Sequence, residues 1–314
     1  MNRKIKLTAA ALAAASLFSM CSFTATATEN NTAQAAENSR TAATATAFSR
    51  YELAVSKIYN KNTGAYSSLA LTHNGKKLSS DLRMINGSPY VAVRSFINEA
   101  TNMTVTYKSA AKTLNVKGTG FEMDVIDGSN VVYANGRCLF SMSPSVIMSG
   151  EIMYAPLSVI AKALGFGYSY NSYTGTVTLS GSVKPLTHGS RYYREDEVYW
   201  LSRIISAESR GESLLGQIAV GSVVMNRVKS SQYPNTIWSV IFDRKYGVQF
   251  SPILDGSIYS SPVAASVVAA KICLEGFNVN TSALFFLYPK YSTSSWIPNN
   301  RKYLFSIGKH DFYA

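Results

Sequence analysis

The chain has 314 residues, and its 30 lysine and arginine side chains outnumber its 18 aspartates and glutamates, which gives a formal net charge of +12. This length can hold about two domains of ordinary size, so a boundary between domains is expected. Three cysteines and three scattered histidines exclude a disulfide scaffold and give no support to a metal centre. We therefore expect no metal and no other cofactor.

The first 27 residues are typical of a secretory signal peptide. Three cations within residues 3–6 precede an apolar run over residues 7–20, and residues 25–27 (Ala-Thr-Ala) supply a small-x-small cleavage motif. A membrane anchor would need about 20 apolar residues, and this run is shorter. Cleavage after Ala27 removes three positive charges and no negative ones, which lowers the net charge from +12 to +9.

The mature chain remains basic, and we expect it to be secreted and associated with the cell wall. An exported basic protein can bind peptidoglycan through the free carboxylates of that polymer, or other anionic wall polymers. The compartment argues against nucleic acid, and no run of lysine and arginine with interleaved aromatic residues supports it. We expect a monomer whose partner is peptidoglycan.

Residues 28–66 are predicted to be a flexible tether. They are rich in Ala, Thr, Asn and Ser and cannot bury enough apolar surface to fold alone. A second small-x-small motif at residues 33–35 would move the cleavage point into this tether. Cys21 would suit a lipoprotein signal, but the residue before it, Met20, is too large for one.

Residues 67–181 contain an internal repeat with an offset of 63 residues. Residues 90–118 align without a gap on residues 153–181. Each copy predicts a short strand that leads into a helix, over residues 94–101 and 157–164, and then a β-hairpin. The predicted hairpin strands are residues 104–107 and 113–116 in the first copy, and residues 167–170 and 176–179 in the second.

This repeat region resembles the domain named after the N-terminus of copper amine oxidases. The resemblance implies a stalk-like β/α module that binds the wall or acts as a structural spacer, and both alternatives are open. Despite the name, copper is not expected, because His73 is the only histidine in the region and a copper site needs several ligands.

Residues 182–194 read as a linker because they combine Pro185, Gly189 and polar residues. Residues 195–314 then follow a helical pattern. A first helix is predicted over residues 196–209, and a second, over residues 214–228, is apolar almost all round and so reads as a buried central helix. Shorter predicted elements are a helix from residues 234–236 to Phe242, a helix capped by Ser261-Pro262 that ends at Gly276, and strands at residues 283–288 and 303–307 that could pair across the loop of Trp296.

Two cysteines remain after removal of the signal peptide. Cys138 falls in the repeat region and Cys273 in the helical region, so they form no disulfide scaffold. Two buried thiols are the simpler interpretation, and a bridge between the two domains stays open.

Seven short blocks in the helical region resemble the SleB-like cell wall hydrolases, a bacterial group that includes spore-cortex-lytic enzymes. The blocks are residues 206–212 (SAESRGE), 216–221 (GQIAVG), 226–228 (NRV), 233–236 (YPNT), 249–251 (QFS), 255–256 (DG) and 307–313 (IGKHDFY). The family commonly has alanine where this chain has Ser209. The substrate implied is vegetative wall or spore cortex.

The resemblance also implies a fold and a catalytic acid. The chain as a whole is predicted to be α+β: an N-terminal two-repeat β/α stalk domain, then a mainly helical, lysozyme-like catalytic domain with a small β-hairpin at residues 195–314. The family places its acid at the end of the first helix, which corresponds to Glu208 in this chain.

The position of Glu208 independently suits a general acid. A carboxylate near a helix C-terminus faces the negative end of the helix dipole, and with partial burial this raises its pKa. The ordinary alternative is a solvated glutamate. Glu212 follows Gly211, so it would more naturally cap or orient the second helix, although a substrate-binding role stays open for it.

The number of acids bears on the mechanism. Hydrolysis by a muramidase or glucosaminidase uses two carboxyl groups, and no local pattern favours Asp243 or Asp255 as the second. A lytic transglycosylase needs one. We therefore favour an exported peptidoglycan hydrolase that cleaves the MurNAc-GlcNAc bond by transglycosylation, with two alternatives: two-carboxylate hydrolysis, and a non-catalytic wall-binding protein. Amide cleavage would need zinc or a Cys-His pair, for which the region offers no ligand set.

A glycan cleft also needs amide groups that form hydrogen bonds and flat apolar surfaces that contact sugar faces. For the aromatic candidates core packing explains the residue type equally well, and for the histidine a structural hydrogen bond is favoured over a proton shuttle. The substrate-binding candidates, besides Glu212, are Gln217, Asn226, Phe250, Tyr288, Trp296 and His310.

Overall fold

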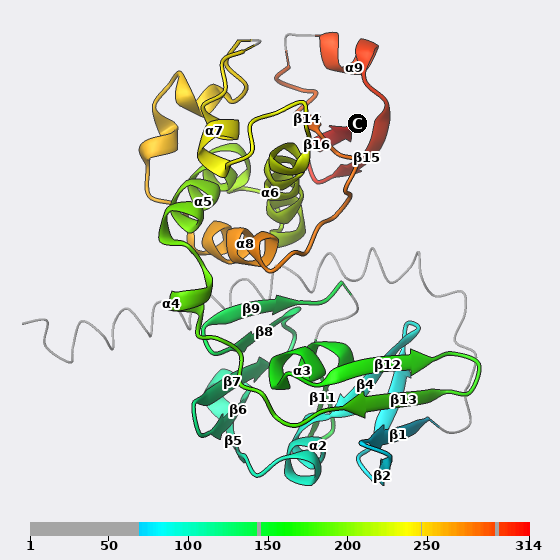
Figure 1. The fold of residues 1–314 in the computed structure, drawn as a ribbon. Helices are drawn as coiled ribbons and strands as arrows, with labels where there is room; N and C mark the ends of the chain where they lie inside the picture. The colour runs from blue at the N-terminus through cyan, green and yellow to red at the C-terminus, as the bar shows by residue number, and fades with distance from the viewer. Residues whose placement is uncertain (1–68, 143–145, 246, 293–294) are drawn as a thin grey trace, which may run out of the picture. The chain divides into compact units, whose positions relative to one another are not determined.

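The computed structural model describes residues 69–142, 146–245, 247–292 and 295–314. The predicted signal peptide and the whole of the predicted tether therefore lie outside the described residues. Strands dominate up to Ser180 and helices dominate from Glu195 onward (Figure 1), so the predicted α+β class is confirmed. None of the described helices combines the length and apolar character that crossing a membrane requires.

The predicted repeat is confirmed as two copies of strand, helix and hairpin. In both copies the helix follows its strand directly, and it buries one face in the core of the repeat domain. The first copy consists of β4 (Ser88–Ala92), α2 (Val93–Ala100), β5 (Thr104–Lys108) and β6 (Thr113–Gly118), and the second of β11 (Ile152–Pro156), α3 (Leu157–Leu164), β12 (Gly167–Asn171) and β13 (Thr176–Ser180).

The two copies pair with each other but extend into different sheets. Strands β4 and β11 are antiparallel neighbours, with Val91 opposite Ala155, and β3 (Leu82–Ile85) and β10 (Ile147–Ser149) complete their sheet. Hairpin β12–β13 joins β1 (Ala70–His73) and β2 (Lys76–Leu78). Hairpin β5–β6 continues into three strands that the repeat pattern does not predict, β7 (Phe121–Ile126), β8 (Val131–Ala134) and β9 (Arg137–Phe140).

The helical domain is built around α6 (Leu214–Lys229), which contacts α5 (Glu195–Ser209), α7 (Ile237–Ile241) and α8 (Ala264–Leu274) (Figure 1). The predicted central helix is thus confirmed. Gly221 of α6 permits close packing, since a Cβ there would lie 2.7 Å from Ile205 Cδ1 and 2.8 Å from Cys273 Sγ. The helix is capped by Ser213, whose hydroxyl accepts a bond from the backbone N–H of Gly216 at 3.2 Å, so the cap is not Glu212.

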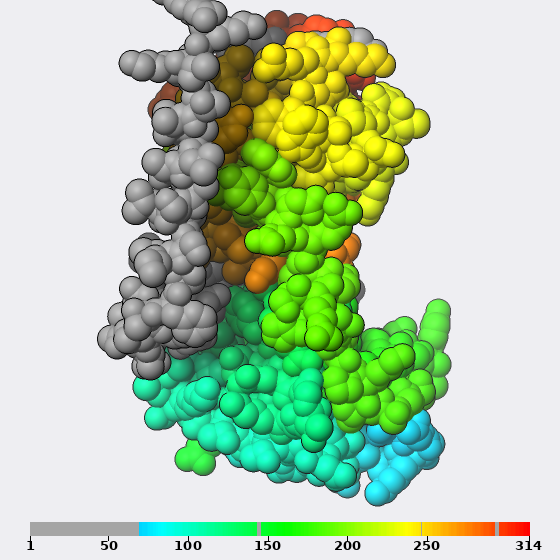
Figure 2. Space-filling model, turned by 60° about the vertical axis from the view of Figure 1, so that its left-hand side comes forward, coloured from blue at the N-terminus to red at the C-terminus, as the bar shows by residue number. Residues whose placement is uncertain are grey.

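The segment between α6 and α8, residues 230–263, covers one face of the helical domain, where it appears largely in yellow in Figure 2. It contains α7, whose start is capped by the Thr236 hydroxyl as the sequence suggests, and the short 3-10 helices η2 (Ser251–Ile253) and η3 (Ser257–Tyr259). Helix α4 (Gly189–Tyr192) lies within the predicted linker.

Two predicted details are wrong. Helix α8 begins at Ala264 with Val263 as its N-cap rather than at Ser261-Pro262, because the backbone N–H of Val263 donates to the Ser206 hydroxyl of α5 at 3.2 Å. Strands β14 (Phe285–Leu287) and β15 (Tyr303–Ile307) do not pair directly, because β16 (His310–Tyr313) lies between them. The Trp296 loop contains α9 (Trp296–Asn300).

The β8–β9 hairpin also supplies side chains to the hydrophobic cluster of the helices. Val131 and Cys138 belong to the same cluster as Cys273. Both thiols are buried, and within the described residues neither forms a disulfide. Arg137 of β9 makes two hydrogen bonds of 2.6 Å with the Glu275 carboxylate after α8. The described residues belong to one compact unit.

Candidate active site

Glu208 lies in the last turn of α5 and is partly buried. Within the described part of the chain, its carboxyl group has no hydrogen-bond or ion-pair partner. Burial and the nearby Asp255 carboxylate raise the pKa of Glu208 to about 7, and the Arg227 guanidinium opposes this rise. The side chain can therefore hold or release a proton near neutral pH, as a general acid must.

The sequence of α5 explains why this carboxyl group is held in place. The first turn contains three acidic residues, which favour a helix start, and one face of the helix is buried through Leu201, Ile204 and Ile205. Ser209, the departure from the family pattern, is buried, and its hydroxyl donates to the Ile205 carbonyl at 2.7 Å. The Ser209 hydroxyl thus bonds to the backbone of its own helix and not to a group of the site.

Arg227 of α6 is the residue that sequence reasoning missed. Its side chain is only 4% exposed, and Nε donates to the Leu284 carbonyl at 2.8 Å. The Nη1 atom is buried and has no hydrogen-bond partner in the part of the chain that the structure describes. Burial lowers the pKa of Arg227, and the charges of Tyr233, Asp243 and Glu208 oppose this. An arginine on a buried, mainly apolar helix was the signal that could have identified it.

Asp255 lies on the loop between η2 and η3, next to an αL glycine. Its Oδ1 accepts a bond of 2.8 Å from the backbone N–H of Ser257, and hydrogen bonding from Ser257 lowers the pKa of Asp255. Asp255 therefore stays ionised where Glu208 is half protonated. Two carboxyl groups with pKa values pushed apart are typical of acid-base sites.

Glu212 anchors a different element. Its side chain is only 8% exposed, it accepts a bond from the backbone N–H of Lys309 at 3.2 Å, and the Lys309 ammonium lies 4.0 Å away. A Cβ on Gly308 would overlap Glu212 Oε2. Glu212 thus holds the turn between β15 and β16 against the start of α6. It is not the cap of that helix, and the alternative that it orients the helix stays a prediction.

The side-chain amides of Gln217 and Asn226 form hydrogen bonds inside the fold. Gln217 donates to the Glu212 carbonyl at 3.0 Å and accepts from the Ser266 hydroxyl at 2.7 Å. The Asn226 amide nitrogen donates to the Asn280 and Ala283 carbonyls, each at 2.8 Å, and its oxygen accepts a 2.7 Å bond from Asn278. Buried amides need such partners, and the geometry favours a structural role for both residues.

Among the aromatic candidates, Trp296 has the most accessible ring. Its side chain is 51% exposed, whereas Phe250 is buried beneath Arg227. Trp296 lies beside Phe285, with ring centroids 6.3 Å apart, and the Arg301 guanidinium lies 5.0 Å above its ring. A half-exposed indole can contact the face of a sugar.

Tyr288 and His310 lie close together, with ring centroids 6.0 Å apart. His310 is buried on β16, and its Nδ1 has no partner within the described residues. Burial lowers the pKa of His310, so the ring is neutral at pH 7. A neutral, enclosed imidazole suits packing better than proton exchange with a substrate.

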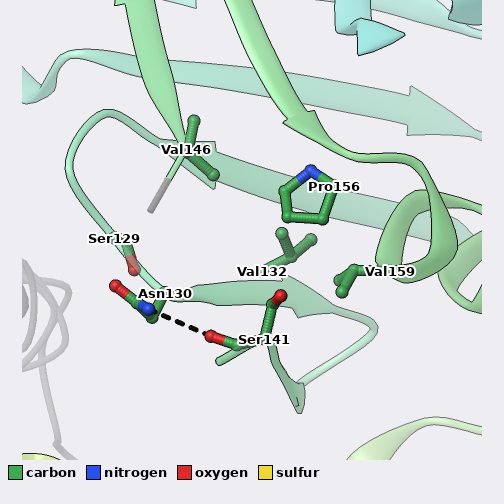
Figure 3. Close-up of a pocket in the computed structure, with 7 residues that line it drawn as sticks. All are labelled: Ser129, Asn130, Val132, Ser141, Val146, Pro156 and Val159. Carbon is green, nitrogen blue, oxygen red and sulfur yellow. Dashed lines mark hydrogen bonds between the residues drawn. The ribbon is translucent and has the colours of Figure 1, made fainter. Parts of the chain in front are cut away.

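Two hollows among the described residues lie away from Glu208. A small one in the repeat domain, too small to admit a water molecule, is shown in Figure 3 with the Asn130 amide donating to the Ser141 carbonyl at 3.0 Å. An open depression of about 450 Å³ lies beside Lys117 and His188. Neither includes Glu208. Among the described residues, no three His, Cys, Asp or Glu side chains gather as a metal site would require.

Comparison with family models matches two parts of the chain. Residues 72–179 match the Copper amine oxidase N-terminal domain, and residues 211–313 match the family described as Cell Wall Hydrolase. The chain carries a cell wall hydrolase domain. Both predicted resemblances are confirmed. The match to the cell wall hydrolase family begins at Gly211, so Glu208 lies just before the matched residues.

Known relatives of the cell wall hydrolase domain share about a third of its residues. A spore cortex-lytic enzyme of Bacillus cereus is 36% identical over 120 residues, which are 38% of this chain and 45% of that enzyme. The spore cortex-lytic enzyme of Bacillus subtilis is 32% identical over 120 residues, 38% of each chain. The chain thus spans less than half the length of these two relatives.

A solved structure is also similar to part of the chain. It is the catalytic domain of the germination-specific lytic transglycosylase SleB from Bacillus anthracis, with 34% identity. The similarity covers 41% of this chain and 100% of that one, at a TM-score of 0.36.

Proposed function

We propose that this protein is an exported enzyme that cleaves the glycan strand of peptidoglycan at the MurNAc-GlcNAc bond, with Glu208 as its acid. The observation that carries the proposal is a partly buried carboxyl group at the start of a cell wall hydrolase domain, whose pKa is raised to about 7 and which has no hydrogen-bond or ion-pair partner among the described residues. Such a group can donate a proton to a glycosidic oxygen near neutral pH.

We favour transglycosylation as the reaction. Protonated Glu208 donates its proton to the oxygen that leaves with GlcNAc as the bond from that oxygen to C1 of MurNAc breaks. The resulting carboxylate then takes the proton of the muramyl C6 hydroxyl, whose oxygen bonds to C1 and closes a 1,6-anhydro ring. Glu208 ends protonated again, and no water is consumed. One carboxyl group is sufficient for this sequence.

Asp255 supports the alternative of two-carboxylate hydrolysis. It is the carboxylate whose charge acts on Glu208, and hydrogen bonding keeps it ionised, as a general base or nucleophile must be. It is, however, on an exposed loop and bonded to the Ser257 backbone. Hydrolysis gives a reducing end where transglycosylation gives an anhydro end, so product chemistry separates the two reactions.

The family match and the net charge support a proposal for the substrate and the location. Relatives of the cell wall hydrolase domain are named spore cortex-lytic enzymes, so cortex peptidoglycan is one candidate substrate, and vegetative wall is the other. The basic chain suits an anionic wall polymer. We propose that a signal peptide cleaved near Ala27 exports the protein, and that the repeat domain binds the wall or spaces the hydrolase domain from it.

Replacing Glu208 with glutamine tests the assignment. The amide keeps the shape of the side chain and cannot donate the catalytic proton, so we expect release of soluble muropeptides to fall by at least about 100-fold. The measurement is solubilisation of purified peptidoglycan, from both vegetative walls and spore cortex, at matched protein concentration.

Two controls accompany this variant. Glu195→Gln changes an exposed glutamate in the first turn of the same helix and should retain wild-type activity. Co-sedimentation with peptidoglycan should show that Glu208→Gln still binds. Activity of Glu208→Gln near the wild-type level would move the acid to another carboxyl group, and a wild-type protein inactive on every wall type would favour the non-catalytic wall-binding alternative.

A further inference from the structure

Arg227 carries a buried positive charge that structural packing alone does not require. Its side chain is 4% exposed, and its Nη1 atom is buried without a hydrogen-bond partner among the described residues. A buried, incompletely bonded cation is expensive, because desolvation of the charge is not repaid by hydrogen bonds. An apolar side chain of similar volume would cost less, so the charge calls for a functional explanation.

The guanidinium is held in one position. Its Nε donates to the Leu284 carbonyl at 2.8 Å. Three aromatic rings surround it, with centroids at 5.0 Å for Tyr233, 5.1 Å for Phe250 and 5.5 Å for Phe285. Rings at this distance attract a cation and exclude water. The charge is therefore fixed and weakly screened, which makes it effective on a neighbouring group.

The effect of the Arg227 charge depends on the other charged groups around Glu208 and Arg227. Glu208 is acted on by Asp255 from the η2–η3 loop and by Arg227 from α6. Arg227 is acted on by Glu208, by Tyr233, and by Asp243 after α7. The Asp243 carboxylate is bonded to the backbone N–H of Lys245 at 2.9 Å. Among the described groups that act on Glu208, Arg227 is the cation.

We propose that Arg227 is a positioning residue that stabilises the carboxylate of Glu208 once the proton has been donated. The inference rests on the proposed function. Burial and Asp255 both raise the free energy of the negatively charged form of Glu208. Without a fixed cation nearby, loss of the proton from this side chain would therefore be less favourable. Arg227 offsets these two effects, and Glu208 can then act as an acid in the first step and as a base in the second.

The test replaces the charge and follows the pH dependence of the reaction. Arg227→Met and Arg227→Gln remove the charge, and the glutamine can still donate to the Leu284 carbonyl. We expect the alkaline limb of the rate profile for muropeptide release to move up by about one pH unit in both variants, with the rate at the optimum reduced about ten-fold. Arg227→Lys keeps a charge and should keep the limb near its wild-type position.

The matched control is Arg203→Met on α5. Arg203 also has a buried Nε that finds no hydrogen-bond partner among the described residues, and its guanidinium lies over an aromatic ring, 3.6 Å from the centroid of Tyr199. It is not, however, among the groups that act on Glu208. The alkaline limb of the rate profile of Arg203→Met should stay at the wild-type pH. A limb that also stays in place in folded Arg227→Met or Arg227→Gln would overturn the proposal, because a purely structural arginine changes rate or stability without moving that limb.

Direct titration of Glu208 keeps the inference separate from the proposed function. Carbon-13 NMR of the labelled side-chain carboxyl, assigned with Glu208→Gln, reports its pKa in wild type, Arg227→Lys and Arg227→Gln without any substrate. We expect a higher pKa in Arg227→Gln than in the other two proteins. An unchanged value would overturn the role of Arg227 even if Glu208→Gln is inactive, and active Glu208→Gln would overturn the proposed function alone.

Discussion

At the scale of single residues, the fold places Glu208, the proposed acid, where ionisation is costly. Glutamate in an unfolded chain titrates near 4.5, and burial together with Asp255 raises the pKa of Glu208 to about 7 in the folded protein. The folded state therefore holds this proton more tightly than the unfolded chain does. Stability is lost as the pH rises from about 4.5 to 7, and the full loss is present above pH 7.

The stability of Glu208→Gln tests whether ionisation of Glu208 destabilises the folded protein. Glutamine does not titrate, so the variant should be more stable than wild type by about 2 kcal/mol at pH 8, after a discount for partial exposure. The difference should shrink to near zero at pH 4. Urea unfolding of both proteins at the two pH values measures it, and a variant that is less stable than wild type at pH 8 would contradict the environment described for Glu208.

Sequence reasoning located Glu208 but could not describe its neighbours. The helix end and the motif at residues 206–212 are local patterns. Arg227 and Asp255, however, act on Glu208 through space from α6 and a loop. Asn226 shows the same limit: its residue type signalled a need for partners, but those partners are carbonyl groups more than 50 residues away.

At the scale of elements, Glu212 connects the start of α6 to the β15–β16 turn. Gly308 has a positive φ of 59°, which favours glycine, and any Cβ there would meet Glu212 Oε2. Helix periods were predictable because apolar spacing repeats along the chain. The strand order β14-β16-β15 was not predictable, because it depends on contacts between segments that are far apart in the sequence.

Gly308→Ala should therefore destabilise the protein by about 2–3 kcal/mol, the sum of backbone strain and displacement of Glu212. Gly256→Ala is the matched control, because Gly256 also has positive φ (76°) but open space around it, and it should cost about 1 kcal/mol. In a Glu212→Ala background the cost of Gly308→Ala should fall to the control value. Equal costs in both backgrounds, measured by chemical denaturation, would refute the anchoring contact.

At the scale of the whole molecule, the sequence predicted two regions of different character because repeats and helical periods are long-range patterns. The β8–β9 hairpin contacts the helical region through Cys138, which packs in the hydrophobic cluster of the helices, and through Arg137, which pairs with Glu275. This hairpin was not predicted, because no local sequence pattern specifies its partners. Residues 211–313 match the cell wall hydrolase family, and residues 72–179 match a domain with no chemistry visible in its sequence. The proposed activity therefore depends on the region that contains Glu208 and Arg227.

Mass spectrometry of the products tests the central claim most directly. Purified protein and its Glu208→Gln variant are incubated with peptidoglycan, and the soluble muropeptides are separated and weighed. Transglycosylation with Glu208 as the acid and base predicts muropeptides with 1,6-anhydro ends, lighter by one water than reducing ends, from wild type and none from the variant. Reducing ends from wild type would contradict transglycosylation, and anhydro products from Glu208→Gln would contradict the assignment of the acid.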